Sequence, residues 1–262
     1  MSEQLPGTAR ADGDMQGHWL LAKLGKRVLR PGGRKLTEKL LDLSGIPNVD
    51  VAELAPGLGR TARRILELKP ASYTSVDSDP DAVSAVRRVV GPDAQLIEAD
   101  AAETGLADES ADLVIGEAVL TMQGEKTKNA IVAEAARILR PGGRYAIHEL
   151  GLVPEELSDE VKTENRQGLA RVIKLNARPL TLGEWTNVLE SNGLKVIKVE
   201  TAPMALLQPR RILSDEGIVG ALRFAKNLLS NSDARQRALQ MRRTFRTRSE
   251  HLNAVAIVAT KK

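Results

Sequence analysis

The sequence contains no cysteine among its 262 residues, and this absence removes several kinds of chemistry at once. Without thiols the chain forms no disulfide, carries no thiolate nucleophile and builds no cysteine-ligated metal site. Its three histidines, His18, His148 and His251, are scattered and lack the spacing of a zinc site, so we predict no bound metal. A chain without disulfides fits a reducing compartment, and we expect it in the cytoplasm.

Aromatic residues and long apolar runs are also scarce. Only 2% of the residues are aromatic, fewer than a protein that stacks exposed bases usually needs. No apolar run approaches the roughly 20 residues that cross a membrane. The polar residues 1–14 lack the apolar stretch of a signal peptide. We therefore predict neither a membrane span nor a secretory leader, and the composition argues against nucleic acid as a partner.

The positive charge gathers in two segments, residues 23–39 and 235–248, although the net charge is only +4. One interpretation is that both segments are solvated helix faces. The other is a surface for an anionic substrate or for nucleic acid. Charge alone leaves both interpretations open.

Strand and helix patterns alternate from residue 49 onward. Strands are predicted at 49–54, 72–76, 94–98, 111–115, 144–149, 194–199 and 252–260, with helices at 60–68, 79–90, 127–139 and 181–192 between them. Thr181 and Glu184 have the spacing of a capping box at the start of the last of these helices. Such alternation implies a doubly wound α/β sheet, mostly parallel, with helices on both faces. The final two strands have no simple helical crossover between them, which favours antiparallel neighbours.

Segments outside this alternation are predicted to be additions to one α/β domain over residues 49–262. Residues 1–16 are polar and predicted to be disordered, and residues 17–48 are predicted to form an N-terminal helical lid with helices at 17–29 and 37–44. Insertions at 151–180 and 203–250, with helices at 154–174, 214–230 and 233–250, are expected to form a cap.

A glycine loop follows the first predicted strand. Gly57 and Gly59 let the backbone turn sharply and approach a ligand, and the helix that follows offers free N–H groups. This pattern alone also matches a dinucleotide-binding fingerprint. Asp77 lies 20 residues after Gly57, where a carboxylate can accept both ribose hydroxyls. The glycine loop and Asp77 together predict that an adenosine ribose is bound, but they do not distinguish among the cofactors that contain one.

Two further acidic residues narrow the choice of cofactor. Glu53 ends the first strand, where a carboxylate would repel a pyrophosphate but suit an ammonium group. Asp100 follows the third strand and can accept the amine of adenine, while the Ala101 N–H faces a ring nitrogen. Adenine, ribose and an ammonium-bearing tail together describe S-adenosylmethionine.

Residues 49–150 resemble the class I S-adenosylmethionine-dependent methyltransferases. The resemblance lies in the ordered motifs Glu-Leu-Ala-Pro-Gly-Leu-Gly from Glu53, Val-Asp-Ser-Asp-Pro from Val76, Glu-Ala-Asp-Ala from Glu98 and Leu-Arg-Pro-Gly-Gly from Leu139. It implies a seven-stranded sheet whose last strand is antiparallel. It also implies that S-adenosylmethionine is bound and S-adenosylhomocysteine released. The cofactor contacts it implies are Glu53, Ala55, Gly57, Gly59, Asp77, Ser78, Asp100, Ala101 and Glu117.

The family's reaction is an SN2 displacement that needs mainly alignment and exclusion of water. The resemblance places the methyl acceptor beside residues 116–122, so Met122 is a candidate substrate contact. Glu117 and His148 are candidate general bases, with hydrogen-bonding or packing roles as the alternative. His18 and Trp19 open the predicted lid and are further candidate substrate contacts.

The sequence leaves three activities open. A methyltransferase acting on a small molecule is favoured. An RNA or protein methyltransferase would use the basic segment 235–248. A NAD-dependent oxidoreductase is disfavoured because neither Tyr73 nor Tyr145 has a lysine four residues on. The oligomeric state, a homodimer included, is not readable from the sequence.

Overall fold

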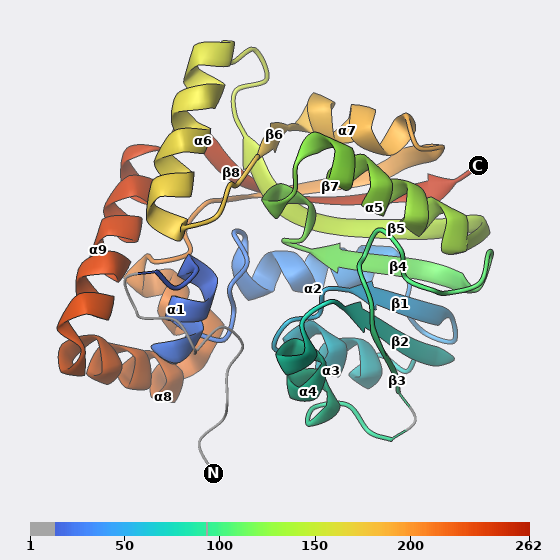
Figure 1. Cartoon of the computed structure of the whole chain (residues 1–262), viewed down its shortest axis with the longest axis horizontal. Helices are drawn as coiled ribbons and strands as arrows, with labels where there is room; N and C mark the ends of the chain where they lie inside the picture. The colour runs from blue at the N-terminus through green and yellow to red at the C-terminus, as the bar shows by residue number, and fades with distance from the viewer. Residues whose placement is uncertain (1–13, 93) are drawn as a thin grey trace.

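The computed structural model describes residues 14–92 and 94–262 and shows one sheet with helices on both faces (Figure 1). The prediction of disorder for residues 1–16 falls mainly outside these described residues. The strands are β1 (Asp50–Leu54), β2 (Ser72–Asp77), β3 (Gln95–Glu98), β4 (Ala111–Glu117), β5 (Leu139–Leu152), β6 (Leu180–Thr181), β7 (Leu194–Pro203) and β8 (Leu252–Lys261).

The strand order in the main sheet is β3-β2-β1-β4-β5-β8-β7, and the short β6 pairs with the end of β5. β8 runs antiparallel to both of its neighbours, while the other pairs are parallel. This confirms the predicted fold class and the antiparallel pairing of the last two strands. β1 lies between β2 and β4, so the crossovers leave it in opposite directions. A crevice opens at such a switch point, beyond the carboxyl ends of the strands.

The helices fall into three groups in Figure 1. Their bounds are α1 (Gly17–Lys23), α2 (Gly33–Ser44), α3 (Arg60–Glu67), α4 (Pro80–Arg87), the 3-10 turn η1 (Leu120–Met122), α5 (Glu125–Ile138), α6 (Asp159–Ile173), α7 (Leu182–Glu190), α8 (Pro209–Ser230) and α9 (Ser232–Thr247). α2, α3 and α4 cover one face of the sheet, and α5 and α7 cover the other. α1, α6, α8 and α9 pack together at one end of the sheet. Within the described ranges, no helix is long and apolar enough to cross a membrane.

The third helical group has an apolar core of its own. Leu20 and Leu21 of α1 pack with Leu169 of α6 and with Met241 and Phe245 of α9. This core contacts the sheet where β5 ends, at Leu152, and where β8 begins, at Leu252. Burial of each such side chain stabilises the fold by about 1.5–3 kcal/mol, so the insertions form a packed layer of the domain.

Several element boundaries differ from those predicted. α1 ends at Lys23 instead of residue 29, because Gly25 takes a φ of +98° and the chain then bonds to α8. β5 continues to Leu152 because β8 pairs with it along its length, up to Leu152 opposite Leu252. α8 begins at Pro209, five residues before the prediction, since proline suits the first helical turn. The capping box at Thr181 and Glu184 is confirmed.

Residues 24–32 are held against α8 by buried charge. The Lys26 ammonium is fully buried and lies 3.6 Å from Asp215 Oδ2 and 3.4 Å from Glu216 Oε1. Glu216 Oε1 also accepts the backbone N–H groups of Arg27 and Val28 at 3.0 and 2.9 Å. Because a buried ammonium needs its counter-charges, this network fixes the N-terminal segment to the cap.

A buried acid near the carboxyl end of β1 bonds to β2. The Tyr73 hydroxyl donates to Glu53 Oε2 at 2.5 Å, and both side chains are nearly inaccessible. Burial raises the pKa of Glu53 to about 7, although the hydrogen bond from Tyr73 acts in the opposite direction. The folded protein therefore binds a proton at Glu53 that the unfolded chain releases between about pH 4.5 and pH 7.

Glu53→Gln should flatten the pH dependence of stability. Because the pKa of Glu53 is higher in the folded protein than in the unfolded chain, its bound proton stabilises the fold. This stabilisation is complete below pH 4.5 and is lost as the pH rises through 7. The wild type should lose up to about 3 kcal/mol relative to Glu53→Gln between pH 5 and pH 8. Urea unfolding at several pH values measures the difference. The exposed Glu98→Gln should keep the wild-type slope, and parallel curves for wild type and Glu53→Gln would contradict the assignment.

Candidate functional site

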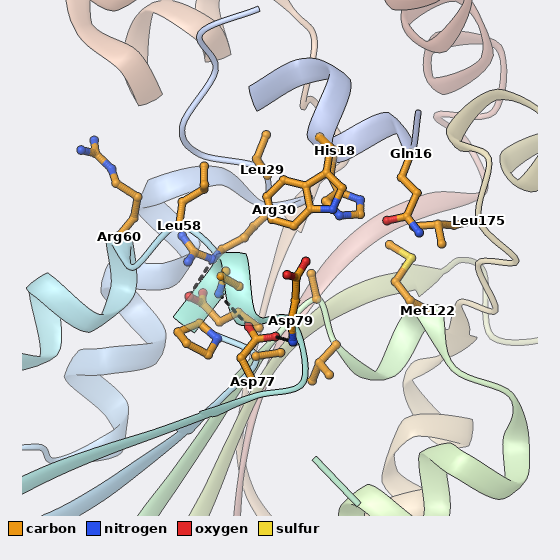
Figure 2. Close-up of a pocket in the computed structure, with 18 of the residues that line it drawn as sticks. Gln16, His18, Leu29, Arg30, Leu58, Arg60, Asp77, Asp79, Met122 and Leu175 are labelled. Carbon is orange, nitrogen blue, oxygen red and sulfur yellow. Dashed lines mark hydrogen bonds and ion pairs between the residues drawn. The ribbon is translucent and has the colours of Figure 1, made fainter. Parts of the chain in front are cut away.

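A cavity of about 430 Å³ lies at the carboxyl ends of β1, β2 and β4, at the switch point of the sheet. Ligand pockets typically enclose about 300–1,000 Å³. The walls come from the N-terminal residues before α2, the loops after β1, β2 and β4, and Leu175 after α6 (Figure 2). The lining residues predicted from the sequence are His18, Trp19, Ala55, Gly57, Asp77, Ser78, Glu117 and Met122.

The loops after β1 and β4 leave the sheet through left-handed backbone. Ala55 has a φ of +53° and Ala118 a φ of +58°, and each follows the last residue of its strand. Their N–H groups donate to the next strand, Ala55 to Val76 O and Ala118 to His148 O, both at 2.8 Å. Such conformations are unfavourable for alanine and tend to occur at functional sites.

Gly57, in the loop after β1, lines the cavity with its backbone. Its φ is +56°, and a Cβ built there would meet no atom within 4 Å. The φ explains why glycine is favoured, and the open space shows that the backbone itself forms the cavity wall. Gly59, also at positive φ, begins α3 and lies behind this wall, outside the lining.

Asp77 closes β2 with its carboxylate toward the cavity (Figure 2). Its Oδ1 accepts the Asp79 N–H at 3.0 Å, and its Oδ2 accepts the Gly57 N–H at a longer 3.4 Å. Burial raises the pKa of Asp77 above its ordinary value, and these N–H bonds oppose the shift. A carboxylate has about four acceptor positions, so Asp77 keeps capacity for a ligand diol.

Glu117 is a buried anion held by four side chains. Arg30 Nε lies 2.7 Å from its Oε2, the hydroxyls of Thr37 and Thr61 donate at 2.6 and 2.5 Å, and His148 Nδ1 lies 2.9 Å from its Oε1. Burial alone would raise the pKa of Glu117, but Arg30 and His148 outweigh it and lower it to about 2. A carboxylate so fully bonded is a poor proton acceptor, so this environment favours anchoring over the predicted role as a base.

His148 is also fully engaged. The Gly32 N–H donates to its Nε2 at 3.3 Å, so we assign the ring proton to Nδ1, which donates to Glu117. The ring is completely buried and does not line the cavity. Its surroundings therefore favour a histidine that orients Glu117 over the predicted general base.

Besides Gly59, three predicted cofactor contacts lie away from the cavity wall. Glu53 is buried behind the loop and bonded to Tyr73. Asp100 is exposed and accepts the Ala102 N–H at 2.7 Å, and neither it nor Ala101 lines the cavity. The predicted convergence of three carboxylates on one cleft is thus seen for Asp77 alone.

The N-terminal segment covers the cavity on the side opposite Asp77 (Figure 2). The rings of His18 and Trp19 lie 4.6 Å apart between centroids, and burial lowers the pKa of His18 to about 4. His18 is therefore neutral near pH 7. Arg30, which the sequence analysis missed, reaches the centre of the cavity through its pairing with Glu117. An arginine beside a proline–glycine turn gave no local signal of this long-range pairing.

A second, narrower cavity of about 70 Å³ adjoins the first. Its walls are almost entirely apolar and come from α1, the end of α6, the segment before α8 and α9. The two cavities share the lining residues His18, Leu29, Ala118, Met122 and Leu175. In the described part of the chain, no three acidic or histidine side chains gather to bind a metal ion.

Comparisons with known proteins agree with this architecture. Residues 51–143 match the family model described as a methyltransferase domain. The chain is 30% identical over 254 residues to an uncharacterized protein of Haemophilus influenzae, an alignment that covers 95% of this chain and 99% of that protein.

Solved structures of similar fold include two methyltransferases. A putative sarcosine dimethylglycine methyltransferase from Galdieria sulphuraria is 16% identical, with a TM-score of 0.69 over 87% of this chain and 86% of the other. Phosphoethanolamine N-methyltransferase 2 of Haemonchus contortus, in complex with S-adenosylhomocysteine, is also 16% identical, with a TM-score of 0.70 over 97% of this chain and 58% of that one. With the motif order and the sheet topology, the match to the family model shows that the chain belongs to the class I S-adenosylmethionine-dependent methyltransferases.

Proposed function

We propose that the protein transfers the methyl group of S-adenosylmethionine to a small molecule bound in the apolar cavity. The observation that carries this proposal is the shared wall between the two cavities, formed by His18, Leu29, Ala118, Met122 and Leu175. An acceptor in the apolar cavity would lie against the cofactor with little room for water. Exclusion of water and alignment are the main requirements of methyl transfer.

The residues of the larger cavity fit the cofactor in three places. Asp77 has acceptor capacity for the ribose hydroxyls. Gly57 lets the backbone approach the ligand. Arg30 presents guanidinium N–H groups beyond the Nε that pairs with Glu117, and these suit the carboxylate of the amino acid tail. When bound, S-adenosylmethionine supplies a methyl group already activated by its sulfonium.

The residues of the chain serve to position the cofactor and the acceptor. Glu117 holds Arg30 in place and, because its pKa is about 2, stays charged throughout the physiological range. Neutral His18 stands between the cavities, where its ring can accept or donate one hydrogen bond to an acceptor without carrying charge. Met122 and Leu175 close the remaining sides against water.

The enclosed shape of the apolar cavity favours a small acceptor over a polymer. Its walls come from four separate segments that pack into one apolar core. The two similar methyltransferases are also named for small acceptors, sarcosine or dimethylglycine and phosphoethanolamine. RNA or protein methylation through the basic helix α9 is the second candidate, because Arg235 and Arg243 are exposed on it.

Asp77→Ala should weaken the binding of S-adenosylhomocysteine by roughly 10- to 100-fold, since hydrogen bonds to a charged group contribute about 1.5–3 kcal/mol. Titration calorimetry measures the affinity, which we expect to be micromolar, about −8 kcal/mol, in the wild type. Asp42→Ala, at an exposed position on α2, serves as the control. Equal affinities for Asp77→Ala and Asp42→Ala would refute the ribose assignment.

Ile173→Trp should abolish methyl transfer while the cofactor still binds. Ile173 lines the apolar cavity and not the larger one, so a bulkier ring would fill the acceptor space alone. The assay incubates protein and labelled methyl donor with a metabolite extract, and label is counted in the fraction that survives ribonuclease and protease. Val219→Trp, at a side chain 71% exposed, is the size-matched control. Label found only in RNA or protein would reject a small-molecule acceptor.

A further inference from the structure

A third hollow, of about 470 Å³, lies where the start of α8 meets the last turns of α9. Its floor is apolar and includes Met204, Leu206 and Phe245. These same three residues line the narrow apolar cavity. One apolar wall therefore lies between the outer groove and the proposed acceptor space. Neighbouring hollows share lining residues, so the three lie side by side from Asp77 to the surface.

The charge of this groove is of one sign. Arg210, Arg242 and Arg246 line it, and none of its lining residues is acidic. All three arginines are exposed, and none forms an ion pair with a carboxylate among residues 14–92 and 94–262. An apolar floor ringed by unneutralised guanidinium groups suits an anion with an apolar body.

The arrangement is unfavourable for stability, which argues for a ligand. Arg242 and Arg246 are four residues apart on α9, so they share one face, and like charges at this spacing repel. The positive end of α8 adds to the same field, because Gln208 caps it without a side-chain bond to the free N–H groups. A planar guanidinium pairs with either a carboxylate or a phosphate in a two-point contact.

We infer that the methyl acceptor is an amphipathic anion, whose carboxylate or phosphate binds Arg210, Arg242 and Arg246. Its apolar body extends past Leu206 and Phe245 toward Ala118, where the atom to be methylated meets the cofactor cavity. Binding energy gained at the remote anionic end positions the other end for reaction. This inference rests on the proposed function and narrows its substrate class.

Titration calorimetry with octanoate, octyl phosphate and octan-1-ol, each in the presence of S-adenosylhomocysteine, tests the groove. Both anions should bind more tightly than the alcohol, and added salt should weaken them. Arg242→Gln/Arg246→Gln should weaken the anions about tenfold and leave the alcohol unchanged, because exposed ion pairs each contribute modestly. The better of the two anions indicates whether the natural group is a carboxylate or a phosphate.

The control is Arg235→Gln/Arg243→Gln, which removes two exposed arginines of the same helix that lie outside the groove. Equal weakening by both double variants would show general charge attraction and overturn the inference, as would equal affinity for octanoate and octan-1-ol. Binding of a 20-nucleotide RNA in preference to the anions would also overturn it. If S-adenosylhomocysteine binds while the anions fail, only the groove inference falls; if neither binds the wild type, the proposed function falls too.

Discussion

The buried carboxylate of Glu117 is the interaction on which the site depends. It accepts bonds from a lid residue, from α2, from α3 and from β5, through Arg30, Thr37, Thr61 and His148. An unpaired charge at this depth would cost several kcal/mol, so all four elements must be in place before the anion is stable. One side chain at the end of β4 thereby couples the sheet to the N-terminal segment.

In the cap, too, a buried charge is stabilised by opposite charges beside it. Lys26 is fully buried because Asp215 and Glu216 lie beside it, and Glu216 also bonds the backbone of residues 27 and 28. Arg211 donates to Gly32 O at 2.7 Å, which brings α8 to the residue that bonds His148. The cap, the lid and the Glu117 cluster are therefore one connected polar network.

Sequence patterns predicted the sheet well because its apolar strands and glycine turns are local signals. The capping box at Thr181 and the loop around Gly57 were read correctly for that reason. The acids were predicted less well because they stand at different heights in the sheet: Glu53 lies inside β1, Asp77 ends β2, and Asp100 comes two residues after β3. Asp77 therefore faces the cavity, Glu53 lies beneath it and Asp100 is in solvent.

The sequence by itself determined the family, the order of strands and helices, and the glycine turn after β1. These follow from short-range periodicity and from residues that act through their own backbone. Only the tertiary structure decided that Glu117 is an anchored anion, that Arg30 enters the cavity and that three arginines line a groove beside the apolar cavity. These features bring together residues that are distant in the sequence, such as Thr37 and Glu117 at 80 positions apart, and such pairings are set by packing, which local patterns do not encode.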